Sequence, residues 1–227
     1  MLYMLHGAAG HFSDWESFIP MLGTRAANPV DLYADNPDGF DSFARHLNAG
    51  SLDGDVLIGY SMGGRLALHA LVNEGSPWSR AVIISSHTGL MDETSRQQRI
   101  KSDQAWAELA EKDFSRFFDE WSRQPVFGDR EMPWSKARNT LPPERLKRCF
   151  TSWSLGRQRN LLPELEKIEI PVLWITGEED KKFTKIAASA VEKMKDSNLE
   201  VIPDSGHRCP WEQPESTSAI IRGFLSP

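Results

Sequence analysis

Asp55-Val56-Leu57-Ile58-Gly59-Tyr60-Ser61-Met62-Gly63-Gly64-Arg65 is the stretch that decides the fold. An apolar run leads into Gly59-x-Ser61-x-Gly63, and a helix-like run follows from Arg65. A strand, Gly-x-Ser-x-Gly and a helix, in that order, form a nucleophile elbow, in which a serine lies on a sharp turn. Residues without side chains on either side avoid clashes in that strained turn. The pattern therefore predicts a nucleophilic serine, with a bystander serine in a glycine-rich turn as the alternative.

Short apolar runs that end in turn residues recur along the chain, with helix-like patterns between them. The expected strands are 2–5, 30–33, 56–58, 81–85, 172–176 and 199–202, and the expected helices are 40–47, 65–73, 184–194 and 215–224. This alternation predicts an α/β protein with a mostly parallel, doubly wound sheet, whose ligands bind beyond the carboxyl ends of the strands. With the elbow, it resembles the α/β-hydrolase fold. The first strand here would be the third of that fold, so its first two strands are expected to be missing or lost.

The alternation stops between Gly89 and Leu162, where helix-like segments rich in Arg, Glu, Gln and aromatic residues follow one another. We predict a helical lid at 89–162, inserted into an α/β-hydrolase core made of 1–88 and 163–227. Residues 91–160 contain 14 Lys or Arg against 11 Asp or Glu, whereas the whole chain carries a net charge of −6. A basic lid on an acidic remainder favours an anionic substrate, with an ordinary solvated surface as the alternative.

Composition restricts the remaining possibilities. A chain of 227 residues with 40% hydrophobic content suits one globular unit with a sizeable core. A net charge of −6 and a pI of about 5.6 argue against a nucleic-acid partner. No apolar stretch reaches the roughly 18 residues of a membrane span, and no signal peptide or disulfide framework is apparent, so cytoplasmic residence is expected. Neither metal-ligand spacing nor a phosphate-binding loop appears, so we expect no cofactor and no metal.

A serine needs an imidazole to accept its proton, and the imidazole needs a carboxylate to fix its tautomer. His207 follows the last predicted strand in the run Pro203-Asp204-Ser205-Gly206-His207, which suits a tight turn at the sheet edge. Asp180 lies in the acidic loop after the strand at 172–176. We therefore predict Ser61, Asp180 and His207 as a catalytic triad. The rival acids are Glu178, Glu179 and Asp204.

The other histidines are weaker candidates for the catalytic base. His6 precedes Gly7 in the loop after the first strand, where we expect it to shape the oxyanion loop and not to carry protons. His69 falls inside a helix; His87 follows a strand end and is a candidate for lining the pocket. The backbone N–H groups of Ala8 and Met62 are the predicted oxyanion hole, because one belongs to the first loop and the other follows the nucleophile.

The chain resembles one family in particular, the 2-succinyl-6-hydroxy-2,4-cyclohexadiene-1-carboxylate synthases, which are lyases of menaquinone biosynthesis. The similarity runs from about residue 6 to 214 and is dense across the predicted lid. Its motifs are His6-Gly7 and Trp15, the elbow, Gly89-Leu90, Arg96, Arg99, Ser102-Asp103, Trp106, Phe118-Asp119-Glu120-Trp121, Gln124-Pro125-Val126-Phe127, Lys136-Ala137-Arg138 and Gly177-Glu178-Glu179-Asp180-Lys181-Lys182-Phe183. The chain departs from the family at residues 31–37, where relatives have Pro-Gly-His-Gly, and at Pro210, where they often have histidine.

The resemblance implies an elimination in which Ser61, activated by His207 and Asp180, removes a proton beside a ketone and pyruvate leaves. The implied substrate is a small tricarboxylate. By position, Arg65, Arg99 and Arg138 match the carboxylate-binding residues of the family, and Tyr60 and Trp121 match residues that line its pocket. Surface ion pairs are the alternative for each arginine. A serine hydrolase of esters, thioesters or carbon–carbon bonds, and a non-catalytic ligand-binding protein, remain the alternative functions.

Overall fold

The computed structural model describes residues 1–23, 26–34, 39–128, 130 and 141–226. Its centre is a six-stranded sheet in the order β2-β1-β3-β4-β5-β6, in which every pair of neighbouring strands is parallel. The strands are β1 (Leu2–Leu5), β2 (Ala27–Val30), β3 (Val56–Tyr60), β4 (Arg80–Ile84), β5 (Val172–Gly177) and β6 (Ser197–Ile202). The predicted fold class is therefore confirmed.

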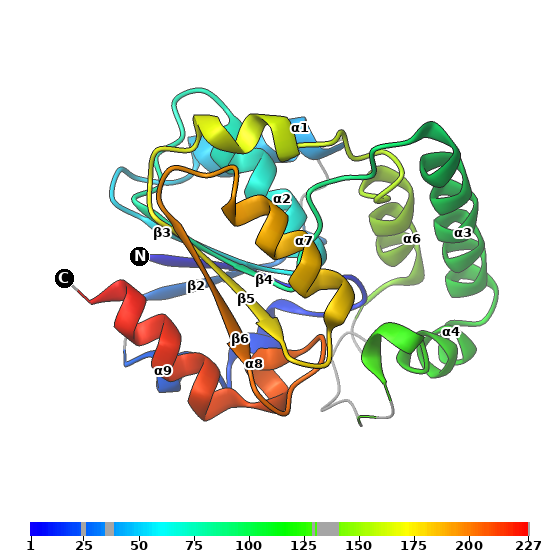
Figure 1. The fold of residues 1–227 in the computed structure, drawn as a ribbon. Coiled ribbons are helices and arrows are strands. Elements are labelled where there is room, and N and C mark those ends of the chain that lie inside the picture. Colours follow the sequence, from blue (N-terminus) through cyan, green and yellow to red (C-terminus); the bar gives the residue numbers. More distant parts are fainter. Residues whose placement is uncertain (24–25, 35–38, 129, 131–140, 227) are drawn as a thin grey trace.

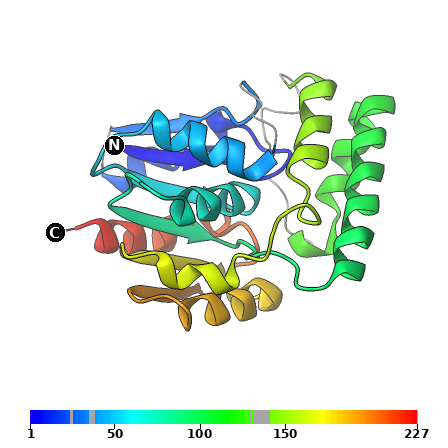
Figure 2. The ribbon, with the colours of Figure 1, turned by 90° about the horizontal axis from the view of Figure 1, so that it is seen from above.

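Helices cover both faces of this sheet (Figures 1 and 2). The α-helices are α1 (Gly39–Ala49), α2 (Met62–Val72), α3 (Glu93–Lys112), α4 (Phe114–Ser122), α6 (Pro143–Ser152), α7 (Lys181–Val191), α8 (Cys209–Glu212) and α9 (Pro214–Leu225). The 3-10 helices are η1 (Phe12–Trp15), η2 (Ile19–Leu22), η3 (Pro125–Phe127) and η4 (Leu162–Lys167). In Figure 1, α1, α2 and α7 lie on one face and α9 lies on the other.

Successive strand residues feed two separate cores, because side chains alternate between the faces of a strand. In β4, Ala81 and Ile83 join the core beneath α1, α2 and α7. Val82 and Ile84 join the other core, which includes Ile221 of α9. A strand buried on both faces reads as a continuous apolar run, which is why these strands were recognisable in the sequence.

The second strand does not lie where the sequence analysis placed it. We expected 30–33, but β2 is Ala27–Val30 and includes Pro29. Proline has no N–H to donate to a ladder, so it argues against an inner strand, yet it is tolerated at an edge. β2 is such an edge, because β1 is its one neighbouring strand among the residues that the structure describes. The apolar residues Leu32 and Tyr33 lie beyond the strand and are buried in the core.

A helical insertion separates β4 from β5 along the chain. In Figure 2 this insertion lies beside the sheet. It contains α3, α4, η3 and α6, and α3 packs along α6. Aromatic rings fill the space between these helices: Trp121 contacts Trp106 at 5.3 Å and Phe150 at 5.0 Å between ring centroids. The boundaries of a separate lid at 89 and 162 remain a prediction.

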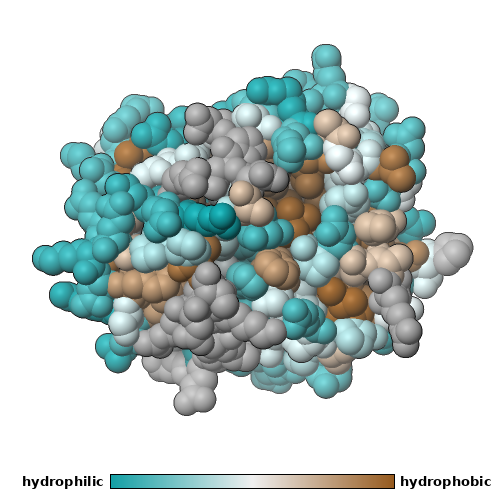
Figure 3. Space-filling model, turned by 180° about the vertical axis from the view of Figure 1, so that it is seen from behind, coloured by the Kyte–Doolittle hydropathy of each residue, from teal (hydrophilic) through white to brown (hydrophobic). Residues whose placement is uncertain are grey.

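The surface seen from behind is largely hydrophilic, with small apolar areas between the polar ones (Figure 3). Among the described residues, no helix combines the length and the apolar character that a membrane crossing requires.

Candidate active site

The elbow joins β3 to α2 at Ser61, whose backbone has φ 52° and ψ −109°. A non-glycine residue in this region is strained, and such strain is typical of functional sites. The turn depends on glycines that allow close backbone approach. A Cβ added to Gly63 would collide with the carbonyl oxygens of Leu5 and His6, and one on Gly59 would lie 2.6 Å from the Gly63 carbonyl oxygen. The local sequence therefore holds the serine hydroxyl above the end of the sheet.

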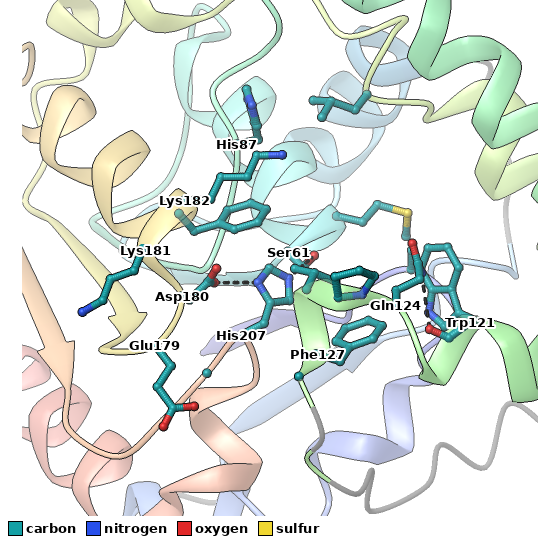
Figure 4. Close-up of a pocket in the computed structure, with 18 of the residues that line it drawn as sticks. Ser61, His87, Trp121, Gln124, Phe127, Glu179, Asp180, Lys181, Lys182 and His207 are labelled. Atoms are coloured by element: carbon teal, nitrogen blue, oxygen red, sulfur yellow. Dashed lines mark hydrogen bonds and ion pairs between the residues drawn. The ribbon is translucent and has the colours of Figure 1, made fainter.

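The ends of three strands bring the predicted triad together (Figure 4). His207 Nε2 lies 3.1 Å from Ser61 Oγ, and His207 Nδ1 lies 2.7 Å from Asp180 Oδ2. Both His207 and Asp180 are buried. A hydrogen bond between Nδ1–H and a carboxylate leaves Nε2 as the acceptor that faces the serine. This arrangement supplies a base next to a hydroxyl group.

The rival acids have other partners. Glu179 accepts a hydrogen bond from the Arg130 guanidinium at 2.8 Å, and Glu178 accepts one from the Asp204 backbone N–H at 3.4 Å. Asp180 is the carboxylate that contacts His207 within the part of the chain that the structure describes.

Glu212 of α8 holds the loop that carries His207. Its carboxylate accepts hydrogen bonds from the backbone N–H groups of Gly206 and Arg208. Sequence reasoning missed this residue, because a loop-binding carboxylate five residues after a histidine has no recognisable motif. The contact fixes the backbone on both sides of the imidazole.

The loop after β1 lies beside Ser61. Ala8 and Met62, the predicted oxyanion residues, both line the same cavity as Ser61. His6 is buried beneath this loop, with Nδ1 2.9 Å from the Gly7 carbonyl oxygen, and burial lowers its pKa to about 4. A neutral, buried histidine in this position supports the loop and does not exchange protons near neutral pH.

A cavity of about 640 Å³ opens above Ser61 and contains most of the predicted substrate residues. Its wall includes Arg65, Arg99 and Trp121. Arg65 is 7% exposed, donates from Nη1 to the Trp153 carbonyl oxygen at 2.8 Å, and has a pKa lowered by burial to about 10. A buried guanidinium retains its charge at neutral pH and has further N–H groups for an anion.

Two more cations share this wall. Arg99 donates to the buried Asp103 carboxylate at 2.8 Å, so it forms an ion pair, which was the alternative that the sequence left open for this arginine. Arg99 also lines the cavity. Lys182 has a pKa lowered by burial and by the charge of Arg99. Sequence reasoning singled out Lys182 only as part of the acid loop. Figure 4 shows it with His87 on one side of the triad, and burial lowers the pKa of His87 to about 3.

The remaining predicted residues are divided. Trp121 lines the cavity on the side where Figure 4 also shows Gln124 and Phe127. Tyr60 instead lines a smaller neighbouring cavity, with its ring 5.6 Å from the His207 ring. Arg138 lies outside the described residues. Among the described residues, no group of three or more His, Cys, Asp or Glu gathers as a metal site would require.

These features define a class: a parallel sheet, a strained serine at the end of its third strand, and a histidine and an acid delivered by later strands. Residues 2–220 match the model of the Alpha/beta hydrolase family, and the chain belongs to that family. Within it, the chain is a homologue of the 2-succinyl-6-hydroxy-2,4-cyclohexadiene-1-carboxylate synthases, so the resemblance found in the sequence is confirmed.

Full-length relatives support this placement. The synthase from Serratia proteamaculans is 27% identical over 99% of this chain and 92% of the relative. The synthase from Escherichia coli is 28% identical over 99% of this chain and 93% of the relative. The structure of MenH from S. aureus superposes with a TM-score of 0.88 and 25% identity, covering 99% of this chain and 92% of that one.

Proposed function

We propose that this chain is a lyase that eliminates pyruvate from 2-succinyl-5-enolpyruvyl-6-hydroxy-3-cyclohexene-1-carboxylate to give 2-succinyl-6-hydroxy-2,4-cyclohexadiene-1-carboxylate. The observation that carries the proposal is the buried guanidinium of Arg65 in the cavity wall, one helical turn beyond Ser61. Ester hydrolysis has no need of a buried cation there, whereas a tricarboxylate does. The shared name of the full-length relatives supports the same reaction.

In the proposed mechanism, His207 Nε2 accepts the proton of Ser61, and Asp180 stabilises the imidazolium that forms. The serine oxygen then removes the proton from the ring carbon beside the succinyl ketone. The electrons of that C–H bond pass through the ring double bond, and the ring C–O bond to the enolpyruvyl group breaks. The departing enolpyruvate takes the proton from His207 and tautomerises to pyruvate, so both catalytic groups return to their starting states.

The charge that develops on the ketone oxygen requires stabilisation. We assign this role to the N–H groups of Ala8 and Met62, because both residues line the cavity beside Ser61. The cations Arg65, Arg99 and Lys182 would bind carboxylates. Arg138 remains a proposed carboxylate partner on the strength of the resemblance, and Tyr60 and Trp121 remain proposed pocket residues.

The test is pyruvate release from the enolpyruvyl substrate, followed with lactate dehydrogenase and NADH. We expect Arg65→Gln to lower kcat/KM by about 10–150-fold, because a lost hydrogen bond to a charged group costs about 1.5–3 kcal/mol. Arg116→Gln is the matched control, since Arg116 is exposed on α4 and pairs with Glu120. Equal rates for Arg65→Gln and Arg116→Gln would remove the observation on which the proposal rests.

Ester hydrolysis is the second candidate, because the contacts of His207 with Ser61 and Asp180 are sufficient for acyl transfer. A fluorophosphonate probe and a panel of aryl esters separate the two reactions. Rapid ester turnover that is unchanged in Arg65→Gln, without pyruvate release from the enolpyruvyl substrate, would favour the hydrolase.

A further inference from the structure

Arg208, the residue after His207, is a buried cation that the proposed mechanism does not use. Arg208 is only 3% exposed. A guanidinium has five N–H donors, yet none of its three nitrogens has a well-placed hydrogen-bond acceptor among the described residues. Buried charges in proteins are ordinarily paired and hydrogen-bonded. This donor set therefore requires an acceptor from outside the described protein atoms.

The position of Arg208 indicates where such an acceptor would bind. Its guanidinium carbon lies 3.8 Å from the centroid of the Phe127 ring. Stacking on an aromatic face leaves the N–H groups directed outward in the guanidinium plane, where planar anions bind in a bidentate manner. Arg208 also lines the smaller cavity of about 50 Å³, together with Tyr60. That volume exceeds the roughly 30 Å³ of one water molecule and suits a single carboxylate group.

This smaller cavity adjoins the main one. Ala8, Trp121 and Phe127 line both cavities. A ligand above Ser61 and a group beside Arg208 would therefore contact the same three residues from two sides. The position lies on the oxyanion-loop side of the site, because Gly7 and Ala8 belong to the loop after β1.

The nearby acids are engaged elsewhere. Glu212 is bound by the backbone N–H groups of Gly206 and Arg208, and the Asp14 carboxylate accepts the His11 N–H at 2.7 Å. Burial lowers the pKa of Arg208, and its interactions with Tyr60, including a side-chain hydrogen bond, and with Glu212 offset that effect only in part.

Arg208 lines a different cavity from Arg65, Arg99 and Lys182. Arg99 lowers the pKa of both Arg65 and Lys182, so these three cations share one region. The groups that act on Arg208 are instead Tyr60 and Glu212. The site thus presents positive charge in two regions, and a ligand with carboxylates at two ends can contact both.

We propose that Arg208, beside the Tyr60 hydroxyl, forms a further carboxylate-binding subsite that holds one end of a polycarboxylate whose other carboxylates contact Arg65 and Arg99. This proposal rests on the proposed function, because it takes the ligand to be a polycarboxylate. It adds the side chain that receives the carboxylate on the oxyanion-loop side. Arg208 would thus bind substrate and contribute to specificity.

Binding of tricarballylate, a stable tricarboxylate, tests the subsite without requiring turnover. Calorimetry would compare the parent, Arg208→Gln, Arg208→Lys and the exposed control Arg116→Gln. We expect Kd to rise at least tenfold in Arg208→Gln, to take an intermediate value in Arg208→Lys, and to stay within twofold of the parent in Arg116→Gln. An unchanged Kd in Arg208→Gln, or an equal loss in Arg116→Gln, would overturn the subsite.

Pyruvate release by the same proteins separates this proposal from the proposed function. Arg208-dependent tricarballylate binding without pyruvate release by the parent would retain the subsite and reject the lyase. Pyruvate release with tricarballylate binding that is unaffected by Arg208→Gln would retain the lyase and reject the subsite.

Discussion

Asp180 and Ser61 contact opposite nitrogens of His207, and each contact sets a different property of the imidazole. The 2.7 Å contact at Nδ1 fixes the tautomer, and the 3.1 Å contact at Nε2 places the basic nitrogen beside the hydroxyl. His6 and His87 lie near the same site, but burial lowers their pKa values to about 4 and about 3. Among these three histidines, His207 is the one whose ring contacts both a buried carboxylate and the Ser61 hydroxyl.

Asp180→Asn tests the role of that partner. The amide would favour the wrong tautomer of His207, and we expect turnover to fall by about 10³–10⁴-fold with the fold retained. Asp204→Asn is the matched control, because Asp204 is an exposed rival whose φ of 50° asparagine tolerates well. A comparable loss in both variants, measured as kcat, would show that the carboxylate of Asp180 has no particular role.

Residues differed in how well the sequence revealed them. The placement of Ser61 and His207 at the ends of strands was predictable, because a strand end and its glycines form a local pattern. Arg208 and Glu212 were not, because a buried guanidinium and a loop-binding carboxylate depend on neighbours that only the fold brings close. Tyr60 was predicted for the pocket itself, but it lines the smaller adjoining cavity.

At the scale of elements, the elbow works because α2 packs closely against the carboxyl end of β1. Gly63 is the point of contact, since a Cβ there would lie 2.6 Å from the His6 carbonyl oxygen. The same contact places the start of α2 beside the loop that contains Ala8. The helix, the turn and the loop after β1 therefore form one unit, and a change in their spacing would alter the site.

Gly63→Ala tests this packing. We expect a loss of about 1–3 kcal/mol in the free energy of unfolding, because the neighbouring atoms are backbone and cannot rotate away. Gly223→Ala, in α9, is the control: nothing lies within 4 Å of its added Cβ, so it should stabilise the protein by about 0.5–1 kcal/mol. Urea unfolding of both variants gives the comparison. Equal free energies of unfolding would argue against the close contact.

The inner strands were predictable because they are buried on both faces and read as continuous apolar runs. The edge strand β2 was not, because pairing with β1 overrides the unfavourable signal of Pro29. Its apolar neighbours Leu32 and Tyr33 belong to the core without belonging to a strand. The local apolar pattern thus identified Leu32 and Tyr33 as buried residues, but it did not identify the residues that pair with β1 as strand β2.

At the scale of the whole molecule, the sheet divides the protein into two cores, and the helical insertion covers the carboxyl ends of the strands where the cavity lies. Several histidines are buried in this frame. Burial lowers the pKa of His6 and of His69 to about 4 and that of His87 to about 3. Between its lowered pKa and pH 6.5, each of these histidines is therefore neutral in the folded protein. In the same pH range the unfolded chain would bind a proton at that histidine.

This difference predicts acid sensitivity. Below pH 6.5 the unfolded chain binds more protons than the folded protein, so stability falls as pH decreases towards about 4. Each such histidine contributes up to about 1.4 kcal/mol per pH unit in that window. His69→Gln, away from the main cavity, should reduce the slope of the unfolding free energy against pH by about 1 kcal/mol per unit. Parallel curves for variant and parent between pH 6.5 and 4 would contradict this.

We propose that Ser61, made basic by His207, removes the proton that leads to loss of pyruvate from a polycarboxylate held in the cavity. The most direct measurement is the initial rate of pyruvate release from the enolpyruvyl substrate with the parent, with Ser61→Ala and without protein. We expect one pyruvate per substrate consumed and a parent rate at least about 10³-fold above that of Ser61→Ala. A parent rate equal to that of Ser61→Ala, or no faster than the reaction without protein, would contradict it.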